Sequence, residues 1–97
     1  MKKSKDLRQM EVSDFYCTCC GNKGICIPRV GKYREPGHLK KLYCLTCDKE
    51  VNMVEIRPHG KYTIYDFWLE FSTHNFDEEG NRIKPWKEAI RDAEKQR

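Results

Sequence analysis

The chain has no long apolar run. Nowhere in its 97 residues does an apolar stretch approach the roughly 18–20 residues that a membrane-spanning helix needs. The basic stretch 1–9 is not followed by the apolar segment that a signal peptide requires, so no secretory signal is predicted. We therefore expect no membrane partner and a cytoplasmic location, where thiols stay reduced and paired cysteines bind metal.

The chain also lacks the short motifs of common catalytic sites. It has no Gly-rich phosphate loop and no nucleophile elbow. The zinc deaminase signature is absent, and His74-Asn75 alone does not supply a nuclease of the His-Asn-His type. The three histidines, His38, His59 and His74, are interpreted as loop residues and not as metal ligands. We expect neither an enzyme nor a small-molecule substrate.

Apolar residues are few for the length of the chain. Hydrophobic residues make up 38% and charged residues 35%, which predicts one domain with a thin core. The net charge of +4 is unevenly placed: residues 17–62 carry nine Lys/Arg against four Asp/Glu, and residues 63–97 carry six against eight. This mild basic bias permits phosphate contacts but does not demand them.

What the chain does contain is two Cys-x2-Cys pairs, Cys17 with Cys20 and Cys44 with Cys47. Such a pair lets both thiolates turn toward one ion, and two pairs supply the four soft ligands of a tetrahedral Zn2+. A set of four thiolates leaves no position for water, so one structural zinc is predicted. The spacer of 23 residues between the pairs slightly exceeds the usual spacing of roughly 15–20 residues, so the connecting loop must be long.

We call residues 17–21 the first cysteine turn and residues 44–48 the second. Gly21 suits the positive φ that often follows the second cysteine of such a turn, whereas Asp48 tolerates it less well. The first turn also contains Cys19 and so offers more than one pairing. The two-residue spacing favours Cys17 with Cys20, and Cys19 is then predicted to point outward. Cys26 is predicted to be a small buried apolar residue.

Hydrophobic patterning predicts a small α+β fold. Residues 1–14 are interpreted as a flexible polar N-terminus, residues 15–61 as a module of short strands, and residues 62–97 as a helical extension that packs on it. Strands are expected at 15–16, 25–27 and 51–56, with Pro28 ending the second strand or placing it at a sheet edge, and Leu42-Tyr43 leads into the second cysteine turn. Residues 30–41, rich in Gly, Pro and Lys, are expected to form a loop.

The last third of the chain has helical periodicity. Thr63 with Asp66 resembles a capping box, and an apolar stripe of Ile64, Phe67, Trp68 and Phe71 follows. Pro85 suits the first position of a second helix. The aromatic residues of this region are interpreted as core, with an aromatic recognition surface as the alternative; they are Tyr62, Tyr65, Phe67, Trp68 and Trp86.

The segment between the two cysteine turns is the predicted contact surface. It mixes cations with aromatic and imidazole rings that can stack on bases. The alternative is a solvated loop held at both ends by the cysteine turns. The predicted contact residues are Arg29, Lys32, Tyr33, Arg34, His38, Lys40 and Lys41.

Residues 15–57 resemble a zinc ribbon. The resemblance lies in the motif Tyr16-Cys17-x2-Cys20-Gly21 together with Leu42-Tyr43-Cys44-x2-Cys47. Residues 37–44 and the charged helical tail also resemble small uncharacterised zinc-ribbon proteins of phages and Gram-positive bacteria. The resemblance implies the metal module and leaves its function open. Residues 28–41 contain only Glu35, so the paired acids of transcription-elongation zinc ribbons are not implied.

Three functions remain compatible with these features. The first is a non-enzymatic adaptor or regulator that contacts nucleic acid weakly, or a nucleic-acid-handling protein complex. The second is a small inhibitor that docks on a host protein. The third is an iron electron carrier that resembles rubredoxin, although Asp48 stands where rubredoxins have glycine after the second cysteine pair.

Overall fold

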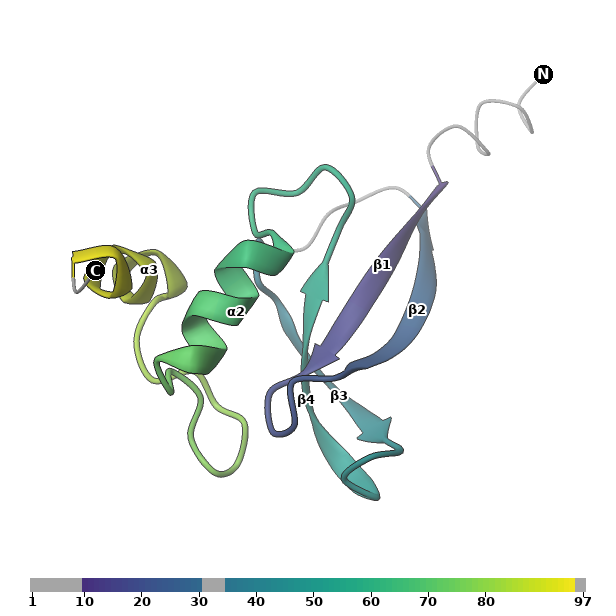
Figure 1. Cartoon of the computed structure of the whole chain (residues 1–97). Helices are drawn as coiled ribbons and strands as arrows, with labels where there is room; N and C mark the ends of the chain where they lie inside the picture. Colours follow the sequence, from purple (N-terminus) through teal and green to yellow (C-terminus); the bar gives the residue numbers. More distant parts are fainter. Residues whose placement is uncertain (1–9, 31–34, 96–97) are drawn as a thin grey trace.

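A computed structural model describes residues 10–30 and 35–95. As predicted, it shows a small α+β fold in which antiparallel strands precede two helices (Figure 1); the strands number four, one more than predicted. No helix in the described part is long and apolar enough to cross a membrane. The strands are β1 (Met10–Cys17), β2 (Lys23–Val30), β3 (Leu39–Cys44) and β4 (Lys49–Ile56), and the helices are α2 (Ile64–Ser72) and α3 (Trp86–Lys95).

The strand order explains why the two cysteine turns meet. The sheet has the order β2-β1-β4-β3, so two hairpins are joined through the antiparallel pairing of β1 with β4. In that pairing Cys17, at the end of β1, lies opposite Met53 of β4. Because β1 runs into the first turn and β4 runs out of the second, both turns lie at the same end of the sheet (Figure 1).

Strand β1 begins at Met10, which corrects the predicted flexible segment 1–14 for residues 10–14; residues 1–9 lie outside the described part of the chain. The physical reason is a buried polar pair. Ser13 is fully buried, and its hydroxyl donates a hydrogen bond of 2.5 Å to Oε2 of Glu55 in β4. A polar side chain with such a partner is compatible with a buried strand, but the sequence alone does not reveal the partner.

Strand β3 begins at Leu39, so the predicted loop 30–41 ends earlier than expected. Leu39 pairs with Val54 and packs against a core cluster that contains Val54 and Phe67, which fixes the start of the strand. Strand β2 extends over Pro28 and lies at an edge of the sheet, as the proline predicted.

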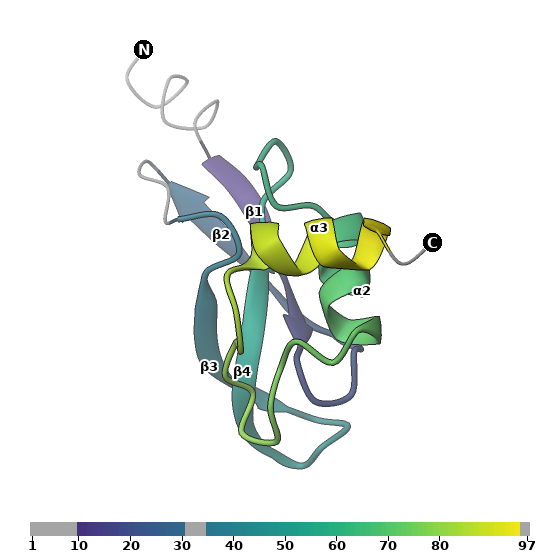
Figure 2. The ribbon, with the colours of Figure 1, turned by 90° about the vertical axis from the view of Figure 1, so that its left-hand side faces the viewer.

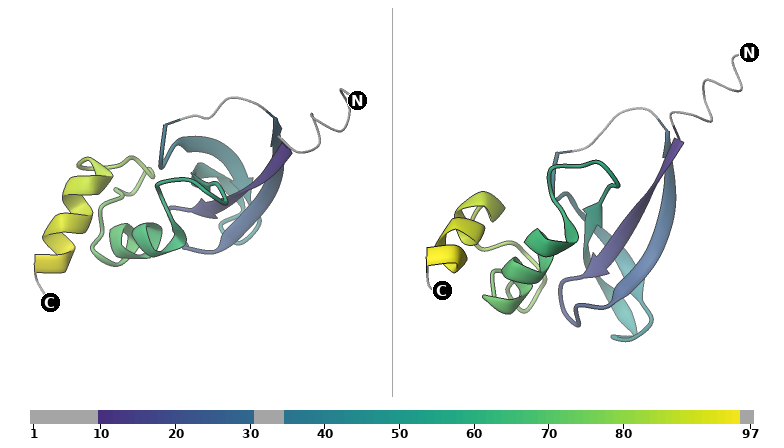
Figure 3. Two further views of the ribbon diagram at one scale, coloured as in Figure 1. Left: turned by 90° about the horizontal axis from the view of Figure 1, so that it is seen from above. Right: turned by 45° about the horizontal axis from the view of Figure 1, so that its top comes forward.

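The sheet has a core cluster on each face. Met53 and Val54 are neighbours in β4, so their side chains point to opposite faces of the sheet. Both are completely buried, which shows that both faces are covered at this point. Met53 belongs to the cluster that includes Phe15 and the buried cysteines, whereas Val54 packs with Phe67 of α2. Seen from above, α2 lies between the strands and α3 (Figure 3).

The predicted start of α2 is confirmed in detail. The amide of Thr63 donates to Oδ2 of Asp66 at 2.8 Å, and the amide of Asp66 donates to Oγ1 of Thr63 at 3.3 Å.

The interpretation of the aromatic residues as core is wrong for Tyr65 and Trp68, which are 50% and 45% exposed, and Ile64 of the apolar stripe is 38% exposed. Phe67 is the completely buried member of the stripe, whereas Trp68 lies edge-on to the ring of Tyr16 in β1, with the ring centroids 6.5 Å apart.

Helix α3 begins directly after Pro85, close to the predicted start. Its first residue, Trp86, packs edge-on against the ring of Tyr62, with the ring centroids 5.1 Å apart. Figure 2 shows α3 on the side of α2 that faces away from the sheet. Tyr62 therefore connects the segment before α2 with the last helix.

A buried ion pair joins α2 to the loop that follows it. Glu70 is completely buried, and Arg82 donates to its two carboxylate oxygens over 2.8 and 2.9 Å. Tyr62 and Asn75 also donate to this carboxylate, at 2.6 and 2.5 Å. The remaining Nη1 of Arg82 donates to the carbonyl of Gly37 at 2.8 Å. This network ties the helical region to the segment that leads into β3.

Candidate metal centre

The two cysteine turns have the same backbone geometry. In the first turn the amide of Gly21 donates to the carbonyl of Cys17 at 2.9 Å, and in the second the amide of Asp48 donates to that of Cys44 at 2.7 Å. Gly21 has the predicted positive φ of 78°, and Asp48 also adopts a positive φ, 58°. Aspartate is one of the few residues besides glycine that visit this region. The hydroxyl of Tyr43 donates to the Asp48 carboxylate and holds the turn.

Backbone amides point at the first sulfur of each turn. The amides of Cys19 and Cys20 lie 3.3 and 3.4 Å from Sγ of Cys17, and the amide of Cys47 lies 3.5 Å from Sγ of Cys44. A hydrogen bond to the charged form of a group favours that form. These amides therefore help the turns to carry thiolates, the form of cysteine that binds metal.

The four cysteines of the two Cys-x2-Cys pairs converge on one point. Their sulfurs all lie within 4.8 Å of one another. Sγ of Cys17 is 3.8 Å from that of Cys47, and Sγ of Cys20 is 3.7 Å from that of Cys44. Four sulfurs around a zinc ion at about 2.3 Å would be about 3.8 Å apart, whereas a disulfide needs about 2.05 Å. The cluster thus fits a single metal ion and can hold one.

Burial affects the protonation of these thiols. Cys17 and Cys44 are buried, whereas Cys20 and Cys47 are half-buried. Burial raises the pKa of Cys17 to about 11 and also raises the pKa of Cys47. Burial opposes ionisation of Cys44 too, but the Cys47 amide and the neighbouring thiols outweigh it and lower its pKa to about 7. A metal must therefore displace protons from this cluster, so its affinity falls as the pH falls.

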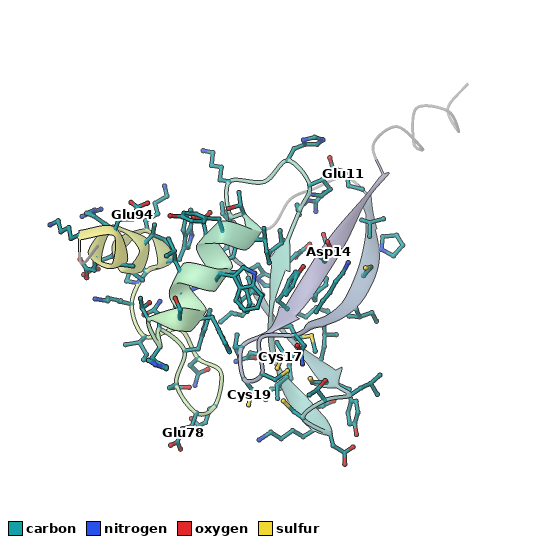
Figure 4. The ribbon with its side chains drawn as sticks, viewed as in Figure 1. Glu11, Asp14, Cys17, Cys19, Glu78 and Glu94 are labelled. Carbon is teal, nitrogen blue, oxygen red and sulfur yellow. The ribbon has the colours of Figure 1, made fainter. Side chains whose placement is uncertain are left out.

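The two remaining cysteines are both exposed. For Cys19 this agrees with the predicted outward direction, and Figure 4 shows it beside Cys17 at the end of β1. For Cys26 the prediction of a buried residue is wrong. Its thiol donates to Oδ1 of Asp14 at 3.1 Å, across the β1–β2 pair. Strand β2 is an edge strand, and its Cys26 side faces solvent.

Three of the predicted contact residues, Arg29, Lys40 and Lys41, lie in strands and not in the expected loop. Arg29 belongs to β2, and Lys32, Tyr33 and Arg34 lie outside the described residues. His38 is half-buried, and its carbonyl accepts a hydrogen bond from the amide of Glu55 at 2.8 Å. Lys40 and Lys41 are consecutive in β3, so their side chains point to opposite faces of the sheet.

Lys41 lies in a hollow that also contains acidic residues. The hollow has a volume of about 450 Å³ and is lined by Lys41 and Lys49 together with Glu50, Glu78 and Glu79. The loop after α2 reaches this place because Nδ2 of Asn52 in β4 donates to the carbonyl of Gly80 at 3.0 Å. No local motif in the sequence indicated that this acidic loop would return to the sheet.

Comparisons with protein-family models, with curated proteins and with solved structures found no match to this chain. The four-cysteine cluster is compatible with a zinc-ribbon-like site, and the comparisons show no family for the chain.

Proposed function

We propose that this chain is a non-enzymatic binding module of the zinc-ribbon type, stabilised by one structural zinc ion, that acts as an adaptor or regulator in the cytoplasm. The observation that supports it best is the convergence of four cysteine sulfurs at the spacing of a tetrahedral thiolate site. Cys17, Cys20, Cys44 and Cys47 would hold the ion and would leave no open position for water or a substrate. In this role the metal supplies folding energy and no chemistry.

Iron is the alternative metal for four thiolates, and it would make the chain an electron carrier. The positive φ of Asp48 removes one objection to that alternative, since the second turn adopts the conformation that glycine would. Colour distinguishes the two ions, because an iron–thiolate protein absorbs visible light and a zinc protein does not. We favour zinc, the usual ion of structural four-cysteine sites.

The charge distribution favours a protein, or a complex of protein and nucleic acid, over naked nucleic acid. The hollow beside Lys41 contains more carboxylates than ammonium groups. Two arginines of the described part, the buried Arg57 and the half-buried Arg82, are engaged in ion pairs, Arg57 with Glu11 at 3.2 Å and Arg82 with Glu70. Two aromatic side chains of α2, Tyr65 and Trp68, are about half exposed. Exposed aromatic residues of this kind are enriched at protein interfaces.

Titration with oligonucleotides tests whether nucleic acid alone is a partner of the chain. We expect weak, sequence-tolerant binding of single- and double-stranded oligonucleotides at low salt, and loss of that binding at physiological salt. Each phosphate contact contributes a slope of roughly 0.7–0.9 in log affinity against log salt, so a few contacts are lost quickly. Fluorescence anisotropy at two salt concentrations measures this.

The matched variant replaces Lys32, Arg34, Lys40 and Lys41 by alanine and should remove the residual binding. Tight, sequence-specific binding at physiological salt would contradict the proposed preference for a protein partner. Residual binding that survives the four substitutions would show that the nucleic-acid surface lies elsewhere on the chain.

A further inference from the structure

The sheet has two edges, and their backbones differ. In an antiparallel pair, opposite residues alternate between hydrogen-bonded and non-hydrogen-bonded pairs. The amide of Thr18 donates to the carbonyl of Asn52 at 3.1 Å, so the even-numbered residues of β1 bond to β4 and the odd-numbered ones to β2. Pro28 lies opposite Val12, and its backbone nitrogen therefore faces away from β1. Proline has no N–H, so the β2 edge lacks a donor there and pairs poorly with another strand.

Strand β3 forms the opposite edge and contains no proline (Figure 2). The amide of Glu55 donates to the carbonyl of His38 at 2.8 Å, which makes these two residues a hydrogen-bonded pair. The same alternation turns the N–H and C=O groups of Leu39, Lys41 and Tyr43 away from β4. Within the described sheet β3 pairs with β4 alone, so this row of backbone groups can pair with an added strand.

The lysines of β3 indicate the charge of such a strand. Lys40 and Lys41 point to opposite faces of the sheet, and neither forms an ion pair with another described residue. The acidic loop with Glu78 and Glu79 is attached to Asn52 of β4, so it approaches Lys41 from the side away from the open edge. An acidic residue of an added strand would therefore meet an ammonium group on either face.

The same lysines disfavour a second copy of this chain at the edge. Two β3 strands related by a two-fold axis pair antiparallel, and their longest overlap is centred on Lys41, the middle one of the outward-facing residues. Each Lys41 would then lie directly opposite the Lys41 of the other copy. Like charges in that position are destabilising, and lysines at a sheet edge oppose self-association.

We propose that the open edge of β3 binds an extended, proline-free segment of a protein partner, with acidic residues beside Lys40 and Lys41 and an apolar residue beside Tyr43. Tyr43 is 52% exposed, and Leu45, which follows β3, is 87% exposed, so the added strand would cover apolar surface at this end. Backbone hydrogen bonds supply affinity, and the side chains select the sequence. This inference rests on the proposed function, because it names the kind of segment by which the adaptor recognises a protein.

Amide hydrogen exchange of the zinc-loaded full chain, followed by NMR, tests the inference with a capped octapeptide of alternating valine and glutamate. We expect the amides of Lys41 and Tyr43 to exchange rapidly in the free chain and several-fold more slowly with the peptide. The amides of Lys40 and Leu42, which face β4, should be protected in both states. The same peptide with lysine in place of glutamate should bind several-fold more weakly.

Lys41→Pro is the sharpest variant, because it removes an outward-facing N–H and leaves the pairing of β3 with β4 in place. It should keep its zinc and lose the peptide. Lys41→Ala keeps the N–H and removes only the charge, so it should weaken binding several-fold. Lys87→Ala is the matched control, since it removes an exposed lysine of α3, and it should bind the peptide like the unchanged chain.

Absence of binding would overturn the inference, and so would binding that leaves the exchange of Lys41 and Tyr43 unchanged or that survives in a folded Lys41→Pro chain. If the proline variant does not fold, Lys41→Ala and the exchange pattern decide. Metal content measured first separates the two claims. A chain purified without zinc contradicts the proposed function, whereas a zinc-containing chain that fails these tests contradicts only the inference about the β3 edge.

Discussion

Cys44→Ser is expected to abolish metal binding and to unfold the sheet around the two cysteine turns. Cys44 is 3% exposed, and its sulfur lies 3.7 Å from that of Cys20. Structural zinc contributes an apparent binding energy of roughly 10–16 kcal/mol, as much as the whole stability of an ordinary domain, about 5–15 kcal/mol. A chain with so few apolar residues cannot replace that contribution. Metal analysis and circular dichroism of the variant measure the two losses.

Cys19→Ser and Cys26→Ser are the controls for this change, because each removes a thiol that lies outside the four-cysteine cluster. Both should keep the metal and the thermal midpoint of the unchanged chain. If Cys44→Ser kept a full equivalent of zinc, or if Cys19→Ser lost it, the assignment of the four ligands would be wrong.

Arg82→Met is expected to lower the free energy of unfolding by about 3–5 kcal/mol, the usual cost of removing one partner of a buried ion pair. The change leaves the fully buried Glu70 without its bidentate partner and removes the donor to the carbonyl of Gly37. A loss of this size lowers the thermal midpoint by about 4–8 °C per kcal/mol in a domain of this length. Denaturant and thermal unfolding of the zinc-loaded chain measure it.

Lys84→Met is the matched control for the buried pair. Lys84 lies 2.6 Å from Asp92, but both side chains are 42% exposed. An ion pair between exposed groups contributes about 0–1 kcal/mol, so this change should have little effect. Similar losses for the two variants would show that the network around Glu70 does not stabilise the fold more than a surface pair does.

Local features of the fold could be predicted from the sequence. The spacing within each Cys-x2-Cys pair indicated which thiols would converge, and the capping box at Thr63 indicated the start of α2. Both patterns depend only on residues a few positions apart. The antiparallel pairing of β1 with β4 brings the two cysteine turns together. This pairing could be predicted from the cysteines of the turns only on the assumption that one metal ion binds all four.

Long-range contacts could not be predicted. From the sequence alone, Ser13 is interpreted as part of a flexible segment, because its hydrogen-bond partner Glu55 is far along the chain. Glu70 lies three residues after the buried Phe67 on α2, a position where a carboxylate needs a buried partner. Nothing in the sequence identifies that partner as Arg82. Exposure of Cys26 likewise depends on which side of the edge strand is left uncovered.

Elemental analysis of the full chain, purified from ordinary medium without added metal, decides whether the four-cysteine cluster is a structural zinc site. We expect a colourless protein with about one equivalent of zinc per chain, as for other closed four-cysteine sites. A chain without metal, or a coloured chain in which iron is the main species, would contradict the proposal.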